Sequence, residues 1–177
     1  MTDFLDPKKV LIEAKIQHGS FVADLGSGVG AFAREISRRV GGTGKVFAVE
    51  VQKDVLLRMQ RDFLHEGIGN VEGIWGDVEK IGGTKIKEGI IDTVLVSNVF
   101  FQVKDKITFL NEIKRILKKG GEVLLVDWLD SFSGLGPKSE EVVSLENAKN
   151  LFINSGFIVE KDKRVSSHHY AILFKLK

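Results

Sequence analysis

The feature that most constrains the fold is a regular alternation between short β-branched runs and amphipathic segments along almost the whole chain. A parallel pair of strands needs a long crossover connection, which is usually a helix. Consecutive strands that alternate with helices are therefore expected to run parallel. Residues 91–97 form a nearly continuous apolar run, which is typical of a strand buried on both faces. The sequence therefore predicts an α/β fold, a Rossmann-like three-layer sandwich with helices on both faces of a mostly parallel sheet.

Glycines, prolines and capping residues place the ends of the expected elements. The expected strands are 20–25, 44–50, 70–75, 91–97 and 122–128, followed by a hairpin of 157–163 and 169–176. Helices are expected from Asp6-Pro7, between 31 and 40, and over 54–65, 106–118 and from 144 onward. The helix 106–118 is expected to end in the basic, glycine-containing segment 118–121. Loops are expected at 78–89 and 130–143.

Length and composition indicate one globular domain. The 177 residues predict a single unit made of an N-terminal helix (1–19), a cofactor-binding core (20–129) and a C-terminal loop, helix and hairpin (130–177). A net charge of +2 does not indicate nucleic acid, and the absence of cysteine excludes disulfides and thiolate metal sites. No metal is expected. Without a signal-peptide pattern or an apolar run long enough for a bilayer, a cytoplasmic location is expected.

A glycine loop at 26–30 joins the first strand to the following helix. In open α/β sheets, ligands bind at the carboxyl ends of strands, and glycine lets the backbone approach them closely. Gly26, Gly28 and Ala31 also fit the dinucleotide pattern, so a nicotinamide or flavin cofactor is an alternative. Asp24 favours S-adenosylmethionine instead, because a fixed negative charge repels a pyrophosphate and attracts an ammonium or a sulfonium.

Two further acids stand at the ends of the next two strands. Glu50 can accept hydrogen bonds from both ribose hydroxyls, as it would in a nicotinamide enzyme too, and Asp77 can accept one from the adenine amino group. Any one of these acids alone is more simply read as a solvated strand end or a helix cap. Three acids at three successive strand ends, together with the glycine loop, indicate an adenosine-containing ligand.

Five segments resemble the motifs of class I S-adenosylmethionine-dependent methyltransferases, of the ubiquinone/menaquinone-biosynthesis type. The segments are 22–30 (VADLGSGVG), 46–50 (VFAVE), Gly76-Asp77, 92–98 (DTVLVSN) and 112–122 (EIKRILKKGGE). The resemblance implies S-adenosylmethionine as cofactor, S-adenosylhomocysteine as product, and a seven-stranded sheet whose antiparallel last strand lies between the fifth and sixth. The expected cofactor-binding residues are Asp24, Gly26, Ser27, Gly28, Gly30, Glu50, Val51, Gly76, Asp77, Val78 and Asn98.

The acceptor side is less determined. Methyl transfer is an in-line displacement, and a general base is needed only if the acceptor must lose a proton. No catalytic residue is assigned; Asp127, His168 and His169 are candidates, although a strand-end cap or a packed histidine explains each of them as well. Similar enzymes often carry a histidine within 98–102, and none is present here. The side chains predicted to wall the acceptor are Phe100, Phe101, Trp128 and Tyr170.

These observations predict a methyltransferase that acts on a small or medium-sized organic acceptor of unknown identity. The alternatives are an RNA or protein methyltransferase, a non-catalytic S-adenosylmethionine-binding module and, last, a nicotinamide enzyme, for which no substrate domain remains. The basic residues are scattered over helix faces, so nucleic acid is not indicated. Few residues precede the first strand, so little of the chain is available to cover the acceptor site. The site is therefore expected to be open or to be completed by a second subunit or partner, and a homodimer is one hypothesis.

Overall fold

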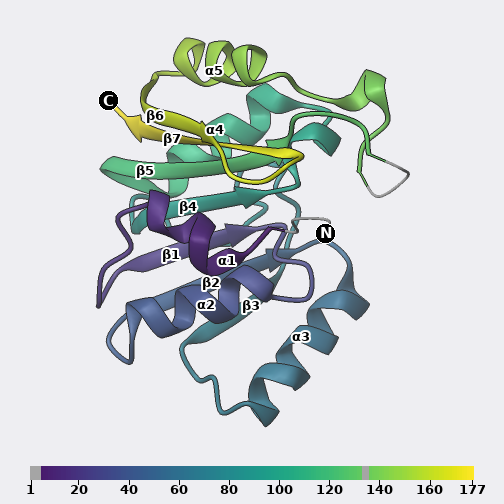
Figure 1. Cartoon of the computed structure of the whole chain (residues 1–177). Coiled ribbons are helices and arrows are strands. Elements are labelled where there is room, and N and C mark those ends of the chain that lie inside the picture. The colour runs from purple at the N-terminus through teal and green to yellow at the C-terminus, as the bar shows by residue number, and fades with distance from the viewer. Residues whose placement is uncertain (1–4, 133–135) are drawn as a thin grey trace.

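A computed structural model describes residues 5–132 and 136–177, and its strands form one seven-stranded sheet in the order β3-β2-β1-β4-β5-β7-β6 (Figure 1). The first five strands are parallel, and β7 is antiparallel to both of its neighbours. This confirms the α/β fold and the antiparallel last strand. The strands are β1 (Phe21–Leu25), β2 (Lys45–Glu50), β3 (Val71–Trp75), β4 (Ile91–Ser97), β5 (Leu117–Trp128), β6 (Phe157–Arg164) and β7 (His169–Leu176).

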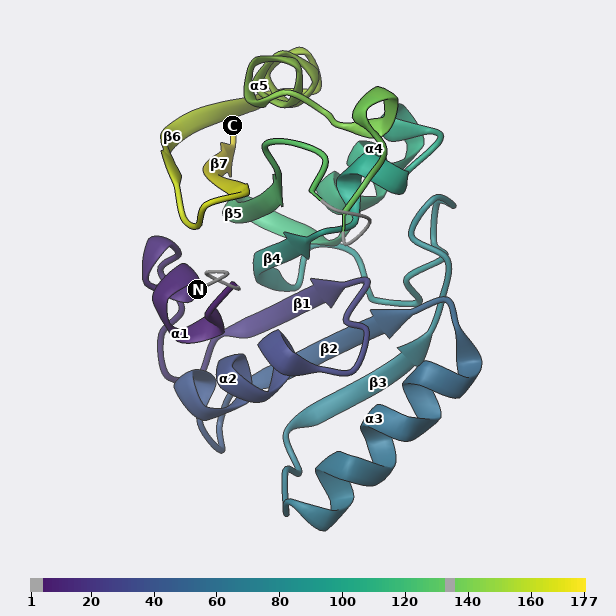
Figure 2. The same ribbon diagram turned by 45° about the vertical axis from the view of Figure 1, so that its right-hand side comes forward.

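Helices cover both faces of this sheet (Figures 1 and 2). The helices α1, α2 and α3 lie on one face, and α4 and α5 lie on the other. Successive residues of β4 enter different cores, since Val94 and Val96 pack on the α4–α5 side and Leu95 packs on the α1–α3 side. The helices are α1 (Pro7–Val10), α2 (Ala31–Val40), α3 (Lys53–His65), α4 (Lys106–Ile116) and α5 (Leu145–Asn154).

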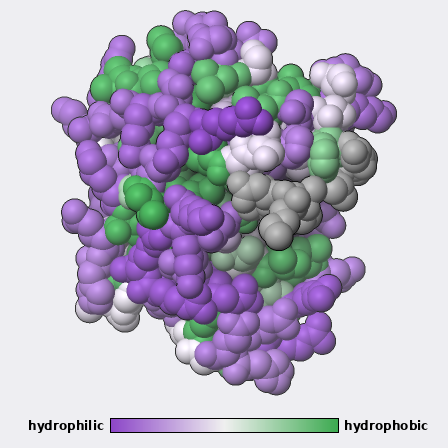
Figure 3. Space-filling view, viewed as in Figure 1, coloured by the Kyte–Doolittle hydropathy of each residue, from purple (hydrophilic) through white to green (hydrophobic). Residues whose placement is uncertain are grey.

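Side-chain caps explain where several helices begin. Asp6 accepts a hydrogen bond from the backbone of Lys8, and proline follows it at the first helical position. Asp105 and Ser144 cap α4 and α5 in the same way. Figure 3 shows that the face seen in Figure 1 is largely hydrophilic, as expected for the outer sides of amphipathic helices. Among the residues described, no helix combines the length and apolar character that a bilayer span requires.

The predicted junction between α4 and β5 was wrong. The helix ends at Ile116, two residues early, and β5 begins at Leu117, five residues before the predicted start. Leu117 is buried opposite Ile91, and the register then shifts so that Glu122 pairs with Thr93. The segment 118–121 is therefore an irregular part of the strand, where Gly120 adopts a φ of 74° and Lys118 pairs with Asp92. The burial of Leu117, and not the basic, glycine-containing pattern at 118–121, thus decides where the helix ends and the strand begins.

Candidate active site

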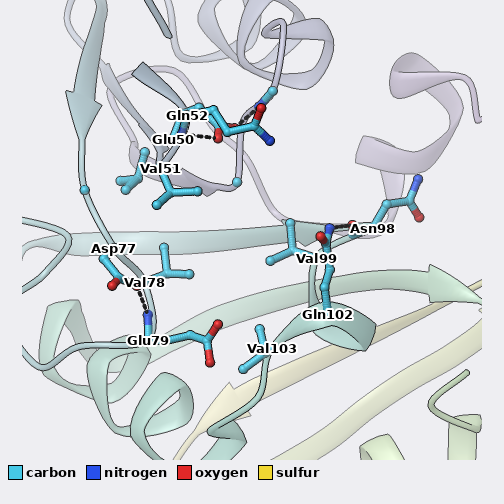
Figure 4. Close-up of a pocket in the computed structure, with 14 residues that line it drawn as sticks. Glu50, Val51, Gln52, Asp77, Val78, Glu79, Asn98, Val99, Gln102 and Val103 are labelled. Carbon is cyan, nitrogen blue, oxygen red and sulfur yellow. Dashed lines mark hydrogen bonds between the residues drawn. The ribbon is translucent and has the colours of Figure 1, made fainter. Parts of the chain in front are cut away.

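A cavity of about 340 Å³ opens at the carboxyl ends of β1 to β4 (Figure 4). This is the edge at which the strand order reverses, between β1 and β4, where open α/β sheets bind ligands. The segments that follow four strands supply its walls. The lining residues are Gly26, Gly28, Val49, Glu50, Val51, Gln52, Gly76, Asp77, Val78, Glu79, Asn98, Val99, Gln102 and Val103.

The glycine loop forms one wall of the cavity. The backbone N–H groups of Gly26 and Ser27 both donate to the carbonyl of Val49, at 2.8 and 3.0 Å, which holds the loop against the end of β2. Gly28 has a φ of 54°, and a β-carbon there would meet no atom within 4 Å. A β-carbon on Gly26 would instead lie 2.3 Å from Val99. The loop therefore needs glycine at 26 for packing, and at 28 it presents bare backbone to open space.

Glu50 is held in place from two sides. Only 7% of its surface is exposed, and its two carboxylate oxygens accept the backbone N–H groups of Gly28 at 3.0 Å and Gln52 at 2.8 Å (Figure 4). Each carboxylate oxygen has a second lone pair, so the group can still accept hydroxyl donors from a ligand. The predicted position of Glu50 in the site is thus accompanied by a fixed orientation.

Asp77 lies on the opposite wall and stays ionised. The ammonium of Lys80, 2.9 Å away, and the backbone N–H of Glu79 keep the pKa of this carboxyl below its ordinary value. Glu79 in turn accepts the backbone N–H groups of Lys104 and Asp105, which joins the loop after β3 to the start of α4. The sequence did not single out Glu79, although it stands two residues after the predicted acid.

A buried network that the sequence did not indicate supports this loop. Glu112 of α4 is 0% exposed and accepts hydrogen bonds from Gly82 N at 2.7 Å, from the Thr84 hydroxyl at 2.5 Å and from Arg115. Burial alone would raise the pKa of Glu112, but these donors outweigh it and lower the pKa to about 2. The carboxylate therefore ties the segment after Asp77 to the helix.

Asp24 lies behind the glycine loop and does not line the cavity. It is 2% exposed, and its Oδ2 has no hydrogen-bond partner among the described residues. Burial, together with the nearby charge of Glu50, raises the pKa of Asp24 to about 7, against the opposing backbone N–H of Ala33. Ser27 and Gly30 also lie outside the lining, where Ser27 contacts Met59 and Gly30 packs against Phe63.

Asn98 follows β4 in a left-handed conformation with a φ of 56°. Its backbone N–H donates to Val126, and its carbonyl accepts the side chain of Gln102. The buried Oδ1 has no partner in residues 5–132 and 136–177. A strained backbone that carries an unpaired acceptor beside a cavity is typical of a ligand-binding position. Gln52, Val99, Gln102 and Val103 were not predicted, although each follows a strand end within a few residues.

Three acceptor-side candidates lie away from the cavity. Asp127 is buried, and its oxygens accept the backbone N–H groups of Phe101 and Trp128, both at 2.9 Å. Burial raises the pKa of Asp127 to about 6, although those two bonds and Lys106 oppose the shift. Phe100 belongs to the core, and the buried Tyr170 donates its hydroxyl to the carbonyl of Val143. Through these hydrogen bonds and this packing, the three side chains hold the segments after β4 and β5 in place.

The remaining candidates lie farther along the sheet edge. Phe101 lines a separate groove of about 510 Å³ between α4 and α5. Trp128 and His169 pack together at the end of β5, with ring centroids 4.1 Å apart. His168 pairs with Asp130 at 2.8 Å and stacks on Phe132. Within the described parts of the chain, no three His, Asp or Glu side chains converge as a metal site would require.

Comparison with known proteins identifies the family. The profile of the methyltransferase domain family matches residues 16–164. The ubiquinone/menaquinone biosynthesis C-methyltransferase UbiE of Idiomarina loihiensis is 30% identical over 115 residues, which are 64% of this chain and 44% of that protein. The UbiE protein of Pseudomonas putida is 29% identical over 140 residues, covering 77% and 53%. The chain thus spans about half the length of these relatives.

Similarity to a solved structure extends over almost the whole chain. A SAM-dependent methyltransferase from Aquifex aeolicus superposes with a TM-score of 0.89 at 27% identity, covering 97% of this chain and 90% of the other. The family profile, the strand order and the position of the cavity agree with one another. The chain belongs to the class I S-adenosylmethionine-dependent methyltransferases, within the methyltransferase domain family.

Proposed function

We propose that this chain binds S-adenosylmethionine in the cavity at the ends of β1 to β4 and transfers its methyl group to a small or medium-sized organic acceptor. One observation carries the proposal: among the described residues, Asn98 Oδ1 at the cavity wall and Asp24 Oδ2 behind the glycine loop lack hydrogen-bond donors, and the cavity is lined by the acids Glu50, Asp77 and Glu79. A ligand with an ammonium, a sulfonium and hydroxyl groups offers the donors and the positive charge that such a site lacks.

The residues fit the parts of this cofactor in order around the cavity. Glu50 would accept the ribose hydroxyls, and Asp77 would accept the adenine amino group. The backbone of Gly28 leaves room for close approach, and Asn98 Oδ1 would accept the ammonium of the methionine part. Asp24, one layer behind, would supply negative charge. A dinucleotide fits less well, because its pyrophosphate would meet this acidic wall.

The bound cofactor supplies an activated methyl group on a sulfonium centre. The chain would contribute position and shielding from water, because methyl transfer from a sulfonium needs alignment of the acceptor more than activation by the protein.

A small organic acceptor is supported by the names of the relatives and by the charge of the chain. UbiE proteins are named for quinone biosynthesis, and a net charge of +2 does not by itself indicate a nucleic-acid partner. The homodimer and the cytoplasmic location expected from the sequence stay predictions.

Calorimetry with S-adenosylhomocysteine and with NAD tests the cofactor, and turnover of labelled S-adenosylmethionine against a metabolite pool and against bulk RNA tests the acceptor. We expect one site for S-adenosylhomocysteine, weaker or no binding of NAD, and label transfer to small molecules. Preferential binding of NAD would overturn the cofactor assignment. Label found only in RNA would overturn the acceptor class.

A further inference from the structure

Two aromatic side chains lie side by side at the edge where the cavity opens. Trp128 ends β5, and His169 begins β7 directly opposite it in the antiparallel pair. Their neighbours Val126 and Ala171 lie in the core on the α1–α3 side, so alternation places both rings on that same face. Asp24 of β1 alternates with Ala23 and Leu25 of the opposite core and faces this side as well. The pair therefore lies at the carboxyl edge of β5, one strand beyond β4.

Hydrogen bonds in the β6–β7 turn determine which nitrogen of His169 carries the proton. Ser166 Oγ accepts the backbone N–H of His168 at 3.2 Å and lies 2.9 Å from His169 Nδ1. The buried serine hydroxyl has one hydrogen, and Nδ1 is the acceptor available to it. Burial, followed by the neighbouring His168, lowers the pKa of His169 to about 4, so its imidazole is neutral. In the tautomer that gives the serine hydroxyl an acceptor, Nδ1 accepts and Nε2 carries the single N–H.

Both rings consequently present N–H groups that nothing in the described chain accepts. His169 is 6% exposed, and neither its Nε2 nor the buried Nε1 of Trp128 has a partner in residues 5–132 and 136–177. An indole nitrogen can only donate. A buried donor without an acceptor has lost its hydrogen bonds to water and gained none in return. The centroids of the two rings are 4.1 Å apart, so both unsatisfied donors belong to one aromatic pair at the end of β5.

The surrounding structure holds the two rings in place. Arg164 donates to the carbonyl of Ser166, and Leu129 donates to the carbonyl of His168, which closes the turn over the end of β5. The backbone of Gly136 lies against the Trp128 ring, so closely that a β-carbon there would come within 2.8 Å of it. The turn and Gly136 therefore pack closely around the two rings.

We propose that Trp128 Nε1 and His169 Nε2 together bind an oxygen of the methyl acceptor, one that has lone pairs and no proton to donate: a carbonyl, a carboxylate or a deprotonated hydroxyl. The inference rests on the proposed function and specifies its substrate class. It also gives His169 a role other than that of a general base, for which the sequence made it one of three candidates, because Nδ1 already accepts the serine hydroxyl. His169 binds and orients the acceptor.

The indole N–H signals in a nitrogen-15 correlation spectrum test this directly, because the chain has only two tryptophans. Trp75 Nε1 already donates to the carbonyl of Val51 at 2.9 Å and serves as the internal reference. With S-adenosylhomocysteine at saturation, benzoate should move the Trp128 indole proton downfield and leave that of Trp75 in place. Acetophenone should act in the same direction and toluene should not. No response to either oxygen probe, or an equal response to toluene, overturns the proposal.

Two variants distinguish the loss of a hydrogen-bond donor from the loss of ring packing. His169→Phe and Trp128→Phe each keep a flat ring and remove one N–H, and each should weaken benzoate binding about tenfold, the loss expected for one hydrogen bond to a charged group. The control His65→Gln, at the end of α3, should bind benzoate as the parent does. Nitrogen-15 shifts of the His169 ring should show a bare Nδ1; a proton on Nδ1 contradicts the proposal.

Different results would count against the proposed function and against the Trp128–His169 site. S-adenosylhomocysteine affinity should be unchanged in both phenylalanine variants, provided that their circular-dichroism melts show a folded protein. Absence of S-adenosylhomocysteine binding in the parent chain counts against the proposed function. Normal binding of it without a benzoate response counts against the Trp128–His169 site alone.

Discussion

Gly28 donates its backbone N–H to Glu50 Oε2 at 3.0 Å, so the loop after β1 and the acid at the end of β2 form one unit. The bond fixes the carboxylate before any ligand binds, and the carboxylate in turn fixes the loop. Loss of the acid should therefore affect the site in two ways, through the missing ligand contact and through a looser loop.

Replacing Glu50 with alanine should lower the affinity for S-adenosylhomocysteine by about tenfold to a hundredfold, as expected for charge-assisted hydrogen bonds of roughly 1.5–3 kcal/mol. Calorimetry measures the change. Glu72→Ala is the matched control, because Glu72 is an exposed acid on the adjacent strand that pairs only with Lys45. Equal affinities in the parent and in Glu50→Ala would show that Glu50 does not hold the ribose.

Asp24 should link cofactor binding to pH. Its folded-state pKa of about 7 lies above its ordinary value of 3.8, so between these values the folded chain binds more protons than the unfolded chain. The stability of the free protein should fall as pH rises through this window. Affinity for S-adenosylmethionine should rise over the upper part of it, because the cation favours the charged carboxylate.

Asp24→Asn should abolish both trends. At about pH 8 the free variant should resist urea at least as well as the parent, since an ionised buried carboxylate has been removed, while it binds S-adenosylmethionine more weakly. Urea titrations at about pH 5 and 8, with calorimetry at each, measure the two effects. A variant that is less stable than the parent at about pH 8 would contradict the explanation by buried charge.

Glu112→Gln should destabilise the fold by about 3–5 kcal/mol, because it leaves Arg115 and the loop donors without their charged acceptor. The helix pair of Glu146 and Lys149 offers the control: the Glu146 side chain is 74% exposed, and Glu146→Gln should cost about 0–1 kcal/mol. The folded pKa of Glu112, about 2, lies below its ordinary 4.5, so its contribution is complete above pH 4.5 and is lost as pH falls toward 2. Urea unfolding of parent and variants across that range checks the sign.

Two substitutions of Asn98 distinguish the effect of backbone strain from the effect of ligand contact. Asn98→Gly relieves the strain of the φ of 56°, whereas Asn98→Ala keeps it. The free energy of unfolding of the glycine variant should therefore exceed that of the alanine variant by about 1 kcal/mol. Both variants lack the amide oxygen and should lose S-adenosylhomocysteine affinity to a similar degree. Full affinity in the glycine variant would mean that conformation, and not Oδ1, matters at this position.

Much of the site could be predicted from local patterns. Glu50, Asp77 and Asn98 line one cavity because each stands at the end of a strand in a parallel sheet, and parallel strands end at a common edge; their binding of the cofactor stays a prediction. The glycine spacing at 26–30 and the terminal hairpin were likewise readable, since backbone conformation and strand alternation leave a mark on neighbouring residues.

Patterns of this kind could not predict which atoms meet across the fold. Glu112 and Thr84 are 28 residues apart, and neither position carries a local signal of their contact. Phe100 and Tyr170 were predicted to wall the acceptor, but packing beneath α4 and α5 places both in the core. The early start of β5 depended on where Leu117 could be buried.

By itself, the sequence determined the α/β architecture, the edge that carries the site and the acids that surround it, because strand period, glycine conformation and charge are properties of short segments. Tertiary structure alone decided which side-chain atoms of residues 5–132 and 136–177 have no hydrogen-bond partner: Asp24 Oδ2 behind the glycine loop, Asn98 Oδ1 at the cavity, and Trp128 Nε1 and His169 Nε2 at the end of β5. The physical reason is that hydrogen-bond satisfaction and burial depend on residues brought together from distant parts of the chain.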